Sequence, residues 1–427
     1  MAEHQRIAVI GLGYVGLPLA VNLALHYPVI GLDIDKGRIA ELESGRDRTR
    51  EIDAGRLAAT TMSFTDNVED IRGCDIYIIT VPTPVDAGNK PDLSAVIGAS
   101  ELVGRVIAKG AIVVYESTVY PGVTEDVGGP AVEAASGLVC GTDFFLGYSP
   151  ERINPGDREH TVDRIIKVVA GQTPEVARTL GEIYGAMTTG GVFLARDIKT
   201  AEAAKVIENA QRDINIAFIN EVATIFQKMG LSIYDVLEAA GTKWNFLNFT
   251  PGLVGGHCIG VDPFYLAHAA TSIGHHPEII LAGRRINDSM GAYVAECVAR
   301  EMALQGRGAG ARVLVLGLTF KENVPDLRNS HVIDIVRGLT ERGFEVEVHD
   351  AFADAAEAKQ LFGVELRPSL DGAEGFACVV GAVAHEPYLA FTPETFSGLL
   401  VADGLVADIK GMWRAMDVPD GMRRWQL

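Results

Sequence analysis

Residues 6–20 read R-I-A-V-I-G-L-G-Y-V-G-L-P-L-A. A run of β-favouring residues, Arg6–Ile10, leads into G-L-G-Y-V-G, and the apolar residues after it suit a buried helix. In such a strand–turn–helix unit the first glycine permits a tight turn, the second lets the backbone approach a pyrophosphate, and the third allows close helix–strand packing. The pyrophosphate would lie at the amino terminus of the helix. The residues of this turn that we expect at a dinucleotide are Gly11, Gly13, Tyr14, Val15 and Gly16.

An acidic residue ends the next β-rich run, Val29–Asp33. At this place Asp33 can accept hydrogen bonds from both hydroxyls of an adenosine ribose, and its charge would repel a 2′-phosphate. The sequence therefore predicts NAD in preference to NADP. A glycine-rich turn without a ligand is the alternative, and FAD is less favoured because no second flavin feature is present.

The apolar start of the chain has about the length of a membrane span, since residues 7–25 are almost unbroken in their apolar character. Glycines, Pro18 and Asn22 interrupt this stretch, however, and Asp33 and Asp35 follow it. A secretory signal fits poorly, because cleavage would remove the glycine motif. We expect a buried strand followed by a buried helix, with no membrane insertion.

Short β-rich runs alternate with helical stretches through the first part of the chain. Strands separated by helices form parallel βαβ units and a doubly wound sheet. The predicted strands are Arg6–Ile10, Val29–Asp33, Asp75–Val81, Ala111–Glu116, Phe144–Ser149 and Ile165–Ala170. Proline and glycine follow several of them, which places turns at the carboxyl edge of the sheet, where open α/β sheets bind ligands.

The second half begins with a long helix at about 200–230 and a further helical region at about 279–305. A βαβ pattern then returns, with a strand at Arg312–Leu318, a helix at His331–Arg342 and a strand at Glu345–Asp350. The predicted fold class is α/β, with two Rossmann-like doubly wound domains joined by a long-helix central segment.

Three domains follow from this pattern: an NAD-binding domain at 1–198, a helical central domain at 199–305 and a second Rossmann-like domain at 306–427. The long helix carries more apolar surface than one chain readily covers. We therefore expect a homodimer that forms through it.

Composition limits the partners and the compartment. The net charge of −19 argues against nucleic acid, whose phosphates require a surplus of Lys and Arg. The five cysteines lack the spacing of a zinc site or a disulfide framework, so we expect no metal, reduced thiols and a cytoplasmic location.

One cysteine stands apart from the others. Cys258 lies in P-G-L-V-G-G-H-C-I-G-V-D-P, residues 251–263, where four glycines let a substrate come close to the backbone. A thiolate there can attack an aldehyde carbonyl. The neighbouring His257 is left without a role. We interpret the remaining cysteines as small apolar residues of the core: Cys74, Cys140, Cys297 and Cys378.

Polar residues also stand out on the long helix and at two strand ends. Lys205 and Asn209 are four residues apart and share a helix face, and apolar neighbours favour a cleft-facing lysine over a solvated one. Glu116-Ser117-Thr118 and Ser149-Pro150-Glu151-Arg152 follow predicted strands, where Glu and Thr can activate or orient water. Either group could instead cap a helix, and spacing alone does not decide.

The whole chain resembles the UDP-glucose/GDP-mannose dehydrogenase family, and within it the bacterial branch that acts on UDP-N-acetylhexosamines in Vi-antigen and O-antigen synthesis. The resemblance rests on motifs in family order over about three-quarters of the chain. They are RIAVIGLGYVGLPLA, VPTP, YESTVYPGVTE, YSPERINPGD, KVIENAQRDINIAFINE, PGLVGGHCIGVDP, HHPEIILAGRRIND and GLTFKENVPDLRNS.

The resemblance implies a role for individual residues. The catalytic group comprises a nucleophilic thiol, its neighbouring carboxylate, an oxyanion-stabilising pair and a water-handling pair, which are Cys258, Asp262, Lys205 with Asn209, and Thr118 with Glu151. Beyond the glycine turn, the implied NAD contacts are Asp33, Arg38, Thr83, Ser117 and Arg328. The implied contacts of the UDP-sugar are Arg152, Lys205, Asn209, Lys243, Gly255 and Lys321.

Two departures from the family pattern concern the substrate. Relatives usually read F-L-P-F-R before PGLVGG, whereas Asn248 and Thr250 replace the Pro and the Arg here. An Arg that the family lends across the dimer has Lys243 as its nearest basic counterpart, and Lys lacks the bidentate fork of Arg.

The activity that the resemblance implies is a four-electron, NAD-dependent oxidation of the C6 hydroxyl of UDP-GalNAc or UDP-GlcNAc to the uronate, through a thioester on Cys258, for surface polysaccharide synthesis. UDP-glucose and UDP-N-acetylmannosamine are alternative substrates. A two-electron hydroxyacid dehydrogenase and a non-catalytic nucleotide-sugar sensor are further alternatives, and each would release a different number of NADH molecules per sugar.

Overall fold

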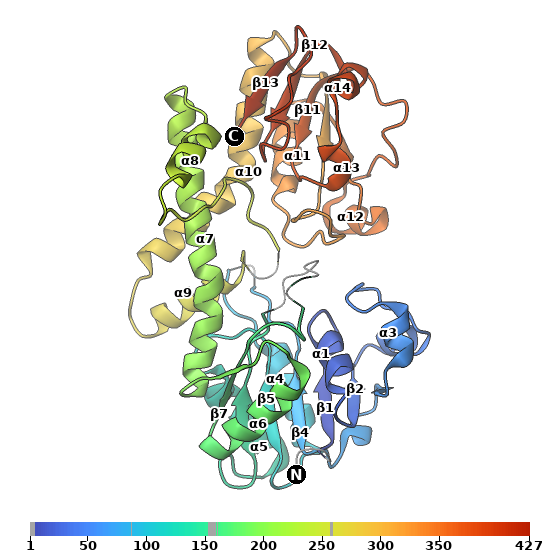
Figure 1. The fold of residues 1–427 in the computed structure, drawn as a ribbon, viewed down its shortest axis with the longest axis vertical. Coiled ribbons are helices and arrows are strands. Elements are labelled where there is room, and N and C mark those ends of the chain that lie inside the picture. The colour runs from blue at the N-terminus through green and yellow to red at the C-terminus, as the bar shows by residue number, and fades with distance from the viewer. Residues whose placement is uncertain (1–4, 87, 153–158, 160, 257–258) are drawn as a thin grey trace. The chain divides into compact units, whose positions relative to one another are not determined.

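The computed structural model describes residues 5–86, 88–152, 159, 161–256 and 259–427 (Figure 1). The chain divides into two compact units. The first comprises residues 1–208 and 264–275, and the second comprises residues 209–263 and 276–427. The long helix α7, Ile198–Lys228, contributes to both.

The first unit is built on an eight-stranded sheet with the order β3-β2-β1-β4-β5-β6-β7-β8. Its strands are β1 Ile7–Ile10, β2 Val29–Leu32, β3 Ser63–Thr65, β4 Ile76–Ile79, β5 Ile112–Tyr115, β6 Phe145–Tyr148, β7 Lys167–Gly171 and β8 Val192–Leu194. The predicted strands are confirmed, and the three-residue strands β3 and β8 are additional. The apolar start of the chain forms β1 and the buried helix α1, as expected.

One strand pair in this sheet is not parallel. β6 and β7 run antiparallel, with Gly147 opposite Gly171, whereas the other pairs of the sheet are parallel. Both glycines lie under helix α6, Pro174–Met187. A β-carbon on Gly147 would collide with Leu180, and one on Gly171 would collide with the backbone of Ala177. The helix therefore packs directly on the backbone of the sheet at the point where the strand direction reverses.

Helices cover both faces of this sheet. Alternate residues of β1 point to opposite sides, so that Ile7 and Val9 join one buried cluster and Ala8 and Ile10 the other. Residues of α1, α2 and α6 pack in the first cluster, and residues of α4 and α5 pack in the second. Besides α6, the start of α7 and most of α9 (Asp262–Ser272), the helical segments of this unit are α1 Gly16–Leu23, α2 Lys36–Glu43, α3 Ala54–Ala59, α4 Ser94–Gly104, α5 Gly129–Ser136, a 3-10 turn at Val68–Ile71 and a π turn at Thr124–Gly128.

The second unit has a five-stranded parallel sheet with the order β10-β9-β11-β12-β13. Its strands are β9 Arg312–Leu316, β10 Glu345–His349, β11 Phe376–Gly381, β12 Leu400–Asp408 and β13 Arg423–Gln426. Residues of α10 and α11 pack on one face, and residues of α14 pack with Trp413 on the other. The helices, α7 and α9 apart, are α8 Ile233–Gly241, α10 Glu278–Leu304, α11 Val332–Glu341, α12 Ala355–Phe362, α13 Glu386–Leu389 and α14 Pro393–Leu399.

Buried polar pairs hold α7 against α10 in the second unit. Arg284 donates to the carboxylate of Asp213 at 2.6 Å, and Asn220 donates to Asn287 at 2.8 Å. Asn220 also donates to the carbonyl of Gly252 at 2.9 Å, which fixes the start of the glycine-rich loop to α7. Within the described ranges no helix combines the length and the apolar character that crossing a membrane requires.

Candidate active site

The glycine turn after β1 has the geometry that its sequence predicts. Gly11 has a φ of +94°, a left-handed conformation that favours glycine, and its N–H donates to the carbonyl of Leu32 at 2.8 Å. A β-carbon on Gly16 would collide with the carbonyl oxygen of Gly11, whereas one on Gly13 would meet no atom within 4 Å. The third glycine therefore serves packing, and the second leaves space above the backbone.

This space suits a pyrophosphate. Helix α1 begins at Gly16 without a side-chain cap at its amino terminus, so its first N–H groups are not used by a capping side chain. Such groups, together with the helix dipole, favour an anionic ligand. The residues of the turn fit the dinucleotide that the sequence predicts.

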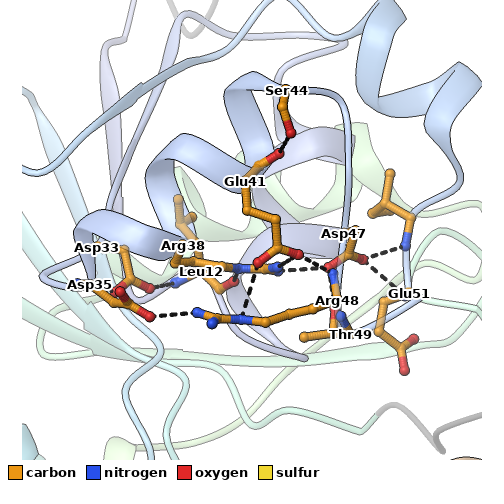
Figure 2. Close-up of polar contacts among 11 residues, drawn as sticks. Leu12, Asp33, Asp35, Arg38, Glu41, Ser44, Asp47, Arg48, Thr49 and Glu51 are labelled. Atoms are coloured by element: carbon orange, nitrogen blue, oxygen red, sulfur yellow. Dashed lines mark hydrogen bonds and ion pairs between the residues drawn. The ribbon is translucent and has the colours of Figure 1, made fainter.

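Asp33 lies at the end of β2 and holds the turn in place. One carboxylate oxygen accepts from the N–H of Leu12 at 2.8 Å, and the other accepts from the N–H of Asp35 at 2.9 Å (Figure 2). The side chain is half-buried, and the next residue, Ile34, is 82% exposed. Asp33 is thus anchored by the backbone and is still partly accessible to a ribose.

Arg38 lies beside Leu12 of the turn, with Glu41 and Asp47 next to its guanidinium (Figure 2). It is 2% exposed, and its Nε donates to the carbonyl of Leu12 at 2.9 Å. Its terminal nitrogens donate to Asp47 at 2.7 Å and to Glu41 at 3.3 Å. The predicted contact between Arg38 and the adenosine stays a prediction. What the structure shows is a guanidinium that supports the glycine turn.

Asp47 completes this support. Burial works to raise the pKa of its carboxyl, but hydrogen bonds from Thr49, Ile52 and Arg38 hold that pKa below its usual value. The N–H groups of Thr49, Glu51 and Ile52 all donate to the carboxylate, each at 3.0 Å. The charged form of Asp47 therefore ties residues 47–52 to Arg38, and through Arg38 to the turn.

Two further predicted residues of the cofactor site lie at strand ends of the same unit. Ser117, after β5, donates to the carbonyl of Val81 at 2.6 Å. The carbonyl of Thr83, after β4, accepts from the hydroxyl of Tyr265 at 2.8 Å. Thr118 is half-buried beside Ser117. The loops after β4 and β5 are thus linked at the carboxyl edge of the sheet.

Glu151 and Lys205 form a buried pair in the first unit. The Nζ of Lys205, on α7, lies 3.6 Å from a carboxylate oxygen of Glu151, and the two side chains are 5% and 10% exposed. Lys205 is buried and not solvated, and its predicted position facing a substrate cleft stays a prediction. Arg152 pairs with Glu208 at 2.8 Å and donates to the carbonyl of Ile166 at 3.1 Å. Charged groups therefore converge after β6.

Two further predicted site residues meet in the second unit. The amide of Asn209 donates to the carboxylate of Asp262 at 2.5 Å, and both side chains are buried. Asp262 is the first residue of α9, Asp262–Ser272. The sequence placed these residues 53 positions apart, and the fold joins them. Cys258 and His257 lie outside the described residues.

The glycine-rich loop borders a pocket in the second unit. The N–H of Gly256 donates to the carbonyl of Arg328 at 3.2 Å, and Asn329 donates to the carbonyl of Gly256 at 3.1 Å. A β-carbon on Gly255 would lie 2.6 Å from the carbonyl oxygen of Asn329. The lining residues are Leu253, Gly255, Thr319, Phe320, Glu322, Ser330, His331, Val332, Ala382, Val383 and Lys410.

Three predicted ligand contacts lie near this pocket or on the surface. Lys321 is half-buried between the lining residues Phe320 and Glu322. Arg328 is engaged with both carboxylate oxygens of Asp326, at 2.9 Å and 2.6 Å. Lys243 is exposed in the turn after α8. Their contacts with ligands stay predictions.

The sequence analysis missed Lys410. Its Nζ lies 3.2 Å from Glu322 at the pocket wall, and burial, which alone would raise the pKa of Glu322, is outweighed by this ammonium, so that the pKa is lowered. Lys410 stands two residues after β12. Its position after an apolar run, at the carboxyl edge of a parallel sheet, was the available signal.

The four described cysteines do not resemble nucleophiles. Cys74, Cys297 and Cys378 are buried, Cys140 is half-buried, and burial raises the pKa of each thiol. A raised pKa lowers the thiolate fraction, which is the reactive form. The described residues contain no group of His, Cys, Asp and Glu side chains that could hold a metal ion.

Family models cover most of the chain. The NAD-binding domain of the UDP-glucose/GDP-mannose dehydrogenase family matches residues 5–188, its central domain matches 199–289, and its UDP-binding domain matches 314–415. The chain belongs to this family. It is an NAD-dependent UDP-sugar 6-dehydrogenase, and NAD is the dinucleotide that the glycine turn fits.

Relatives match the chain over nearly its full length. Protein CapL of Staphylococcus aureus is 53% identical over 99% of this chain and 100% of its own. A UDP-N-acetyl-D-glucosamine 6-dehydrogenase of Pseudomonas aeruginosa is 53% identical over 96% of this chain and 97% of its own. The solved structure of a UDP-D-ManNAc dehydrogenase from Pyrococcus horikoshii superposes with a TM-score of 0.89 at 31% identity, covering 98% of this chain and 99% of its own.

Proposed function

We propose that this dehydrogenase oxidises UDP-N-acetyl-D-glucosamine, or its C4 epimer UDP-N-acetyl-D-galactosamine, to the corresponding uronate in two steps on one enzyme. The relatives from Pseudomonas aeruginosa and Salmonella typhi that carry the name UDP-N-acetyl-D-glucosamine 6-dehydrogenase are 53% and 47% identical to the chain. Relatives named UDP-N-acetyl-D-mannosamine dehydrogenase reach 35%. The difference in identity supports the gluco or galacto configuration.

The buried Lys205–Glu151 pair is the observation that most supports acid formation. An ammonium within 3.6 Å of a carboxylate can stabilise an oxyanion while the carboxylate accepts a proton from water. A simple alcohol dehydrogenase needs no such water-handling carboxylate. Asn209, held by Asp262, offers an amide as a second oxyanion donor, and removal of one such donor typically costs about 2.7–4 kcal/mol of transition-state stabilisation.

The proposed chemistry balances over two oxidations. When bound, NAD would accept the hydride of the first oxidation, and a second NAD that replaces the departing NADH would accept the hydride of the second. In the first, the C6 alcohol gives up a hydride and a proton and becomes an aldehyde. The thiolate of Cys258 adds to this carbonyl, and loss of a second hydride leaves a thioester. Water, activated by Glu151 with Thr118 beside it, then cleaves the C–S bond, so that the uronate leaves and the thiol is restored.

A substrate panel tests the proposal. UDP-GlcNAc, UDP-GalNAc, UDP-ManNAc and UDP-glucose are compared by kcat/KM, and the NADH formed per sugar consumed is counted. We expect two NADH per sugar and the highest kcat/KM with an N-acetyl gluco or galacto sugar. A preference for UDP-glucose or UDP-ManNAc would contradict the proposed substrate, and one NADH per sugar would contradict the four-electron reaction.

The Cys258→Ser variant tests the covalent step. We expect it to bind NAD and the UDP-sugar as the wild type does and to form no uronate, because a serine hydroxyl is a poor nucleophile at neutral pH. Cys74→Ser, at a buried cysteine of the core, is the matched control for the same atom change. Normal uronate formation by the Cys258 variant would refute the thioester route.

The proposal includes a homodimer and a division into three domains, 1–198, 199–305 and 306–427. Phe218 and Ile225 are seven residues apart and share one face of α7, and Met229 directly follows the helix. These side chains are 58%, 48% and 63% exposed. A second copy of the chain would cover this apolar face. Light scattering should give twice the mass of one chain. The double variant Phe218→Glu/Ile225→Glu should give the mass of a single chain.

A further inference from the structure

A buried group of three side chains in the first unit has no part in the proposed chemistry. Glu116 follows β5, Lys167 begins β7 and Tyr184 lies on α6, and none is more than 1% exposed. The Nζ of Lys167 lies 3.0 Å from a carboxylate oxygen of Glu116 and 5.0 Å from the centre of the Tyr184 ring. The sequence suggested Glu116 as a residue that could activate water. The fold instead turns it inward.

The pair joins the two strand ends on which the predicted water-handling residues stand. Glu116 precedes Ser117 and Thr118 directly along the chain. Lys167 also lies 3.4 Å from the carbonyl oxygen of Pro150, the residue before Glu151. One ammonium therefore binds the segment of Thr118 through a carboxylate and the segment of Glu151 through a carbonyl.

The backbone around this pair reinforces the link. The N–H of Ser149 donates to the carbonyl of Tyr115 at 3.0 Å, which is the last ladder bond between β5 and β6. Strands β5 and β6 end next to this bond, and the hydroxyl of Tyr148 donates to the carbonyl of Ser117 at 3.3 Å. The Lys167 ammonium thus fixes the relative position of two loops at a place where sheet hydrogen bonds have ended.

Stability alone does not explain a charged pair at this depth. The cost of removing both charges from water is large, and well-packed apolar side chains of similar volume are often as stable or more stable. Burial raises the pKa of Glu116, and the Lys167 ammonium opposes that rise. The hydrogen bonds of a lysine–glutamate pair are directional, whereas apolar packing is not. Here these bonds connect the loop of Thr118 with the loop of Glu151.

We propose that Glu116 and Lys167 are positioning residues for thioester hydrolysis, since they set Thr118 and Glu151 relative to each other. The inference rests on the proposed function. It assigns the pair to the hydrolytic step and not to hydride transfer, because the contacts of Lys167 lead to the loops of Thr118 and Glu151. The glycine turn has its own support in Arg38 and Asp47.

The test follows the covalent intermediate in Lys167→Met, Glu116→Gln and the double variant Glu116→Leu/Lys167→Met. Enzyme is mixed rapidly with saturating UDP-GlcNAc and NAD, NADH is followed by absorbance, and intact-protein mass spectrometry detects sugar bound to Cys258. We expect a burst of two NADH per site at the wild-type rate, followed by steady turnover about 10- to 100-fold slower, with the thioester accumulating. The value of kcat/KM for NAD should not change, because the steps that precede the thioester are unaffected.

Two comparisons separate positioning from folding. The double variant leaves no unpaired buried charge, so its melting temperature should stay near that of the wild type while its hydrolysis remains slow. Lys109→Met, which removes an exposed partner of Asp143 in the same unit, should leave both phases unchanged. Wild-type hydrolysis in the stable double variant, or slowing confined to the NADH burst, would overturn the inference.

Failure of the proposed function gives a different result. If the wild type itself formed one NADH per sugar and no adduct on Cys258, the thioester mechanism would be wrong, and the positioning inference would be rejected with it. If the wild type formed two NADH and the adduct but the variants hydrolysed it normally, only the inference would be rejected.

Discussion

The chain contains the same turn twice, after β1 in the first unit and after β9 in the second. Gly11 and Gly317 have φ values of +94° and +92°, and their N–H groups donate to the last residue of the adjacent strand, Leu32 or His349. Asp33 accepts from Leu12 at 2.8 Å, and Asp350 accepts from Leu318 at 2.5 Å. The two turns therefore share the same backbone conformation and the same pattern of hydrogen bonds.

The side chains of the two turns differ. The first reads G-L-G-Y-V-G, whereas the second reads G-L-T-F-K-E, so Thr319 and Glu322 replace the second and third glycines. Thr319 is fully buried, and its hydroxyl donates to the carbonyl of Lys321 at 2.9 Å and lies 3.1 Å from the Nε2 of His385. The space that Gly13 leaves free in the first turn is filled in the second.

His385 closes the second turn from above. Its Nδ1 accepts from the N–H of Asn323 at 2.9 Å, so the proton is on Nε2, which lies 3.2 Å from Asp350. Burial alone would raise the pKa of Asp350, but His385 and backbone N–H groups hold it well below its usual value. In the first turn, glycines leave the backbone accessible to a ligand. In the second turn, the same backbone conformation is covered by buried side chains.

The largest effect is expected when the second turn is opened. His385→Ala removes a fully buried partner of the Asp350 carboxylate, and we expect a loss of about 3–5 kcal/mol in the free energy of unfolding. Affinity for UDP should fall as well, because Thr319 and Asn323 lose their support. Urea unfolding and UDP titration measure both, with exposed His276→Ala as control. An unchanged urea midpoint would contradict the role of His385.

The first turn is more sensitive to an added methyl group. Gly16→Ala brings a β-carbon onto the carbonyl of Gly11, and we expect NAD to bind about 10- to 100-fold more weakly by calorimetry. Gly98→Ala, on α4 with open space around its β-carbon, is the matched control and should bind NAD normally. Equal NAD affinity in both variants would show that the turn tolerates the displacement.

Buried carboxylates in the two units should give opposite pH dependences. Glu202, on α7, accepts from the N–H groups of Gly122 at 2.6 Å and Thr124 at 2.9 Å, and burial raises its pKa to about 7. The folded state therefore keeps a proton that the unfolded state has lost, so its contribution to stability falls as pH rises from about 4.5 to 7. Asp350 has a lowered pKa, and its contribution is lost only as pH falls below about 4.

Urea midpoints measured between pH 5 and 8 test this difference. The Gln side chain of Glu202→Gln does not titrate. The free energy of unfolding of this variant, relative to the wild type, should therefore rise with pH by up to about 3 kcal/mol. Asp350→Asn should show a constant offset over the same range. A constant offset for Glu202→Gln as well would mean that its carboxyl titrates normally in the fold.

The smallest of the four effects concerns the acidic residues themselves. Asp33→Asn keeps an acceptor for Leu12 but removes the charge near the ribose, and we expect about tenfold weaker NAD binding. Asp350→Asn should leave NAD affinity unchanged, because that carboxylate is sealed by His385. Calorimetric titration with NAD and NADP measures both. Stronger NADP binding by Asp33→Asn would support its role in discrimination, and unchanged selectivity would argue against it.

The sequence predicted what depends on local pattern. Alternating β-rich and helical runs predicted the two sheets. Gly11, Gly16 and Asp33 predicted the turn after the first strand. The strands β3 and β8 escaped notice because three residues carry too little periodicity. The sequence did not predict the buried position of Lys167, for another reason. A lysine at the start of a strand reads as a solvated charge, and only the fold brings Glu116 to it.

Arg38 shows the same limit at the cofactor site. Its family role suggested a side chain reaching a ligand, whereas three of its bonds go to Leu12, Glu41 and Asp47. Sequence spacing gives the residue and its neighbourhood, but the direction of a long side chain depends on partners far along the chain. The predictions that fall on Cys258 and His257 lie outside the described residues.

The facing glycines at the reversal of the first sheet carry a consequence for anyone who would redesign this enzyme. Since the backbone of Ala177 already occupies the place of a methyl group at Gly171, a library that randomises this position should return glycine alone, whereas at Gly147 the obstructing atom is the end of the Leu180 side chain. The contact between strands β6 and β7 and helix α6 would have to be kept unchanged in a redesigned enzyme.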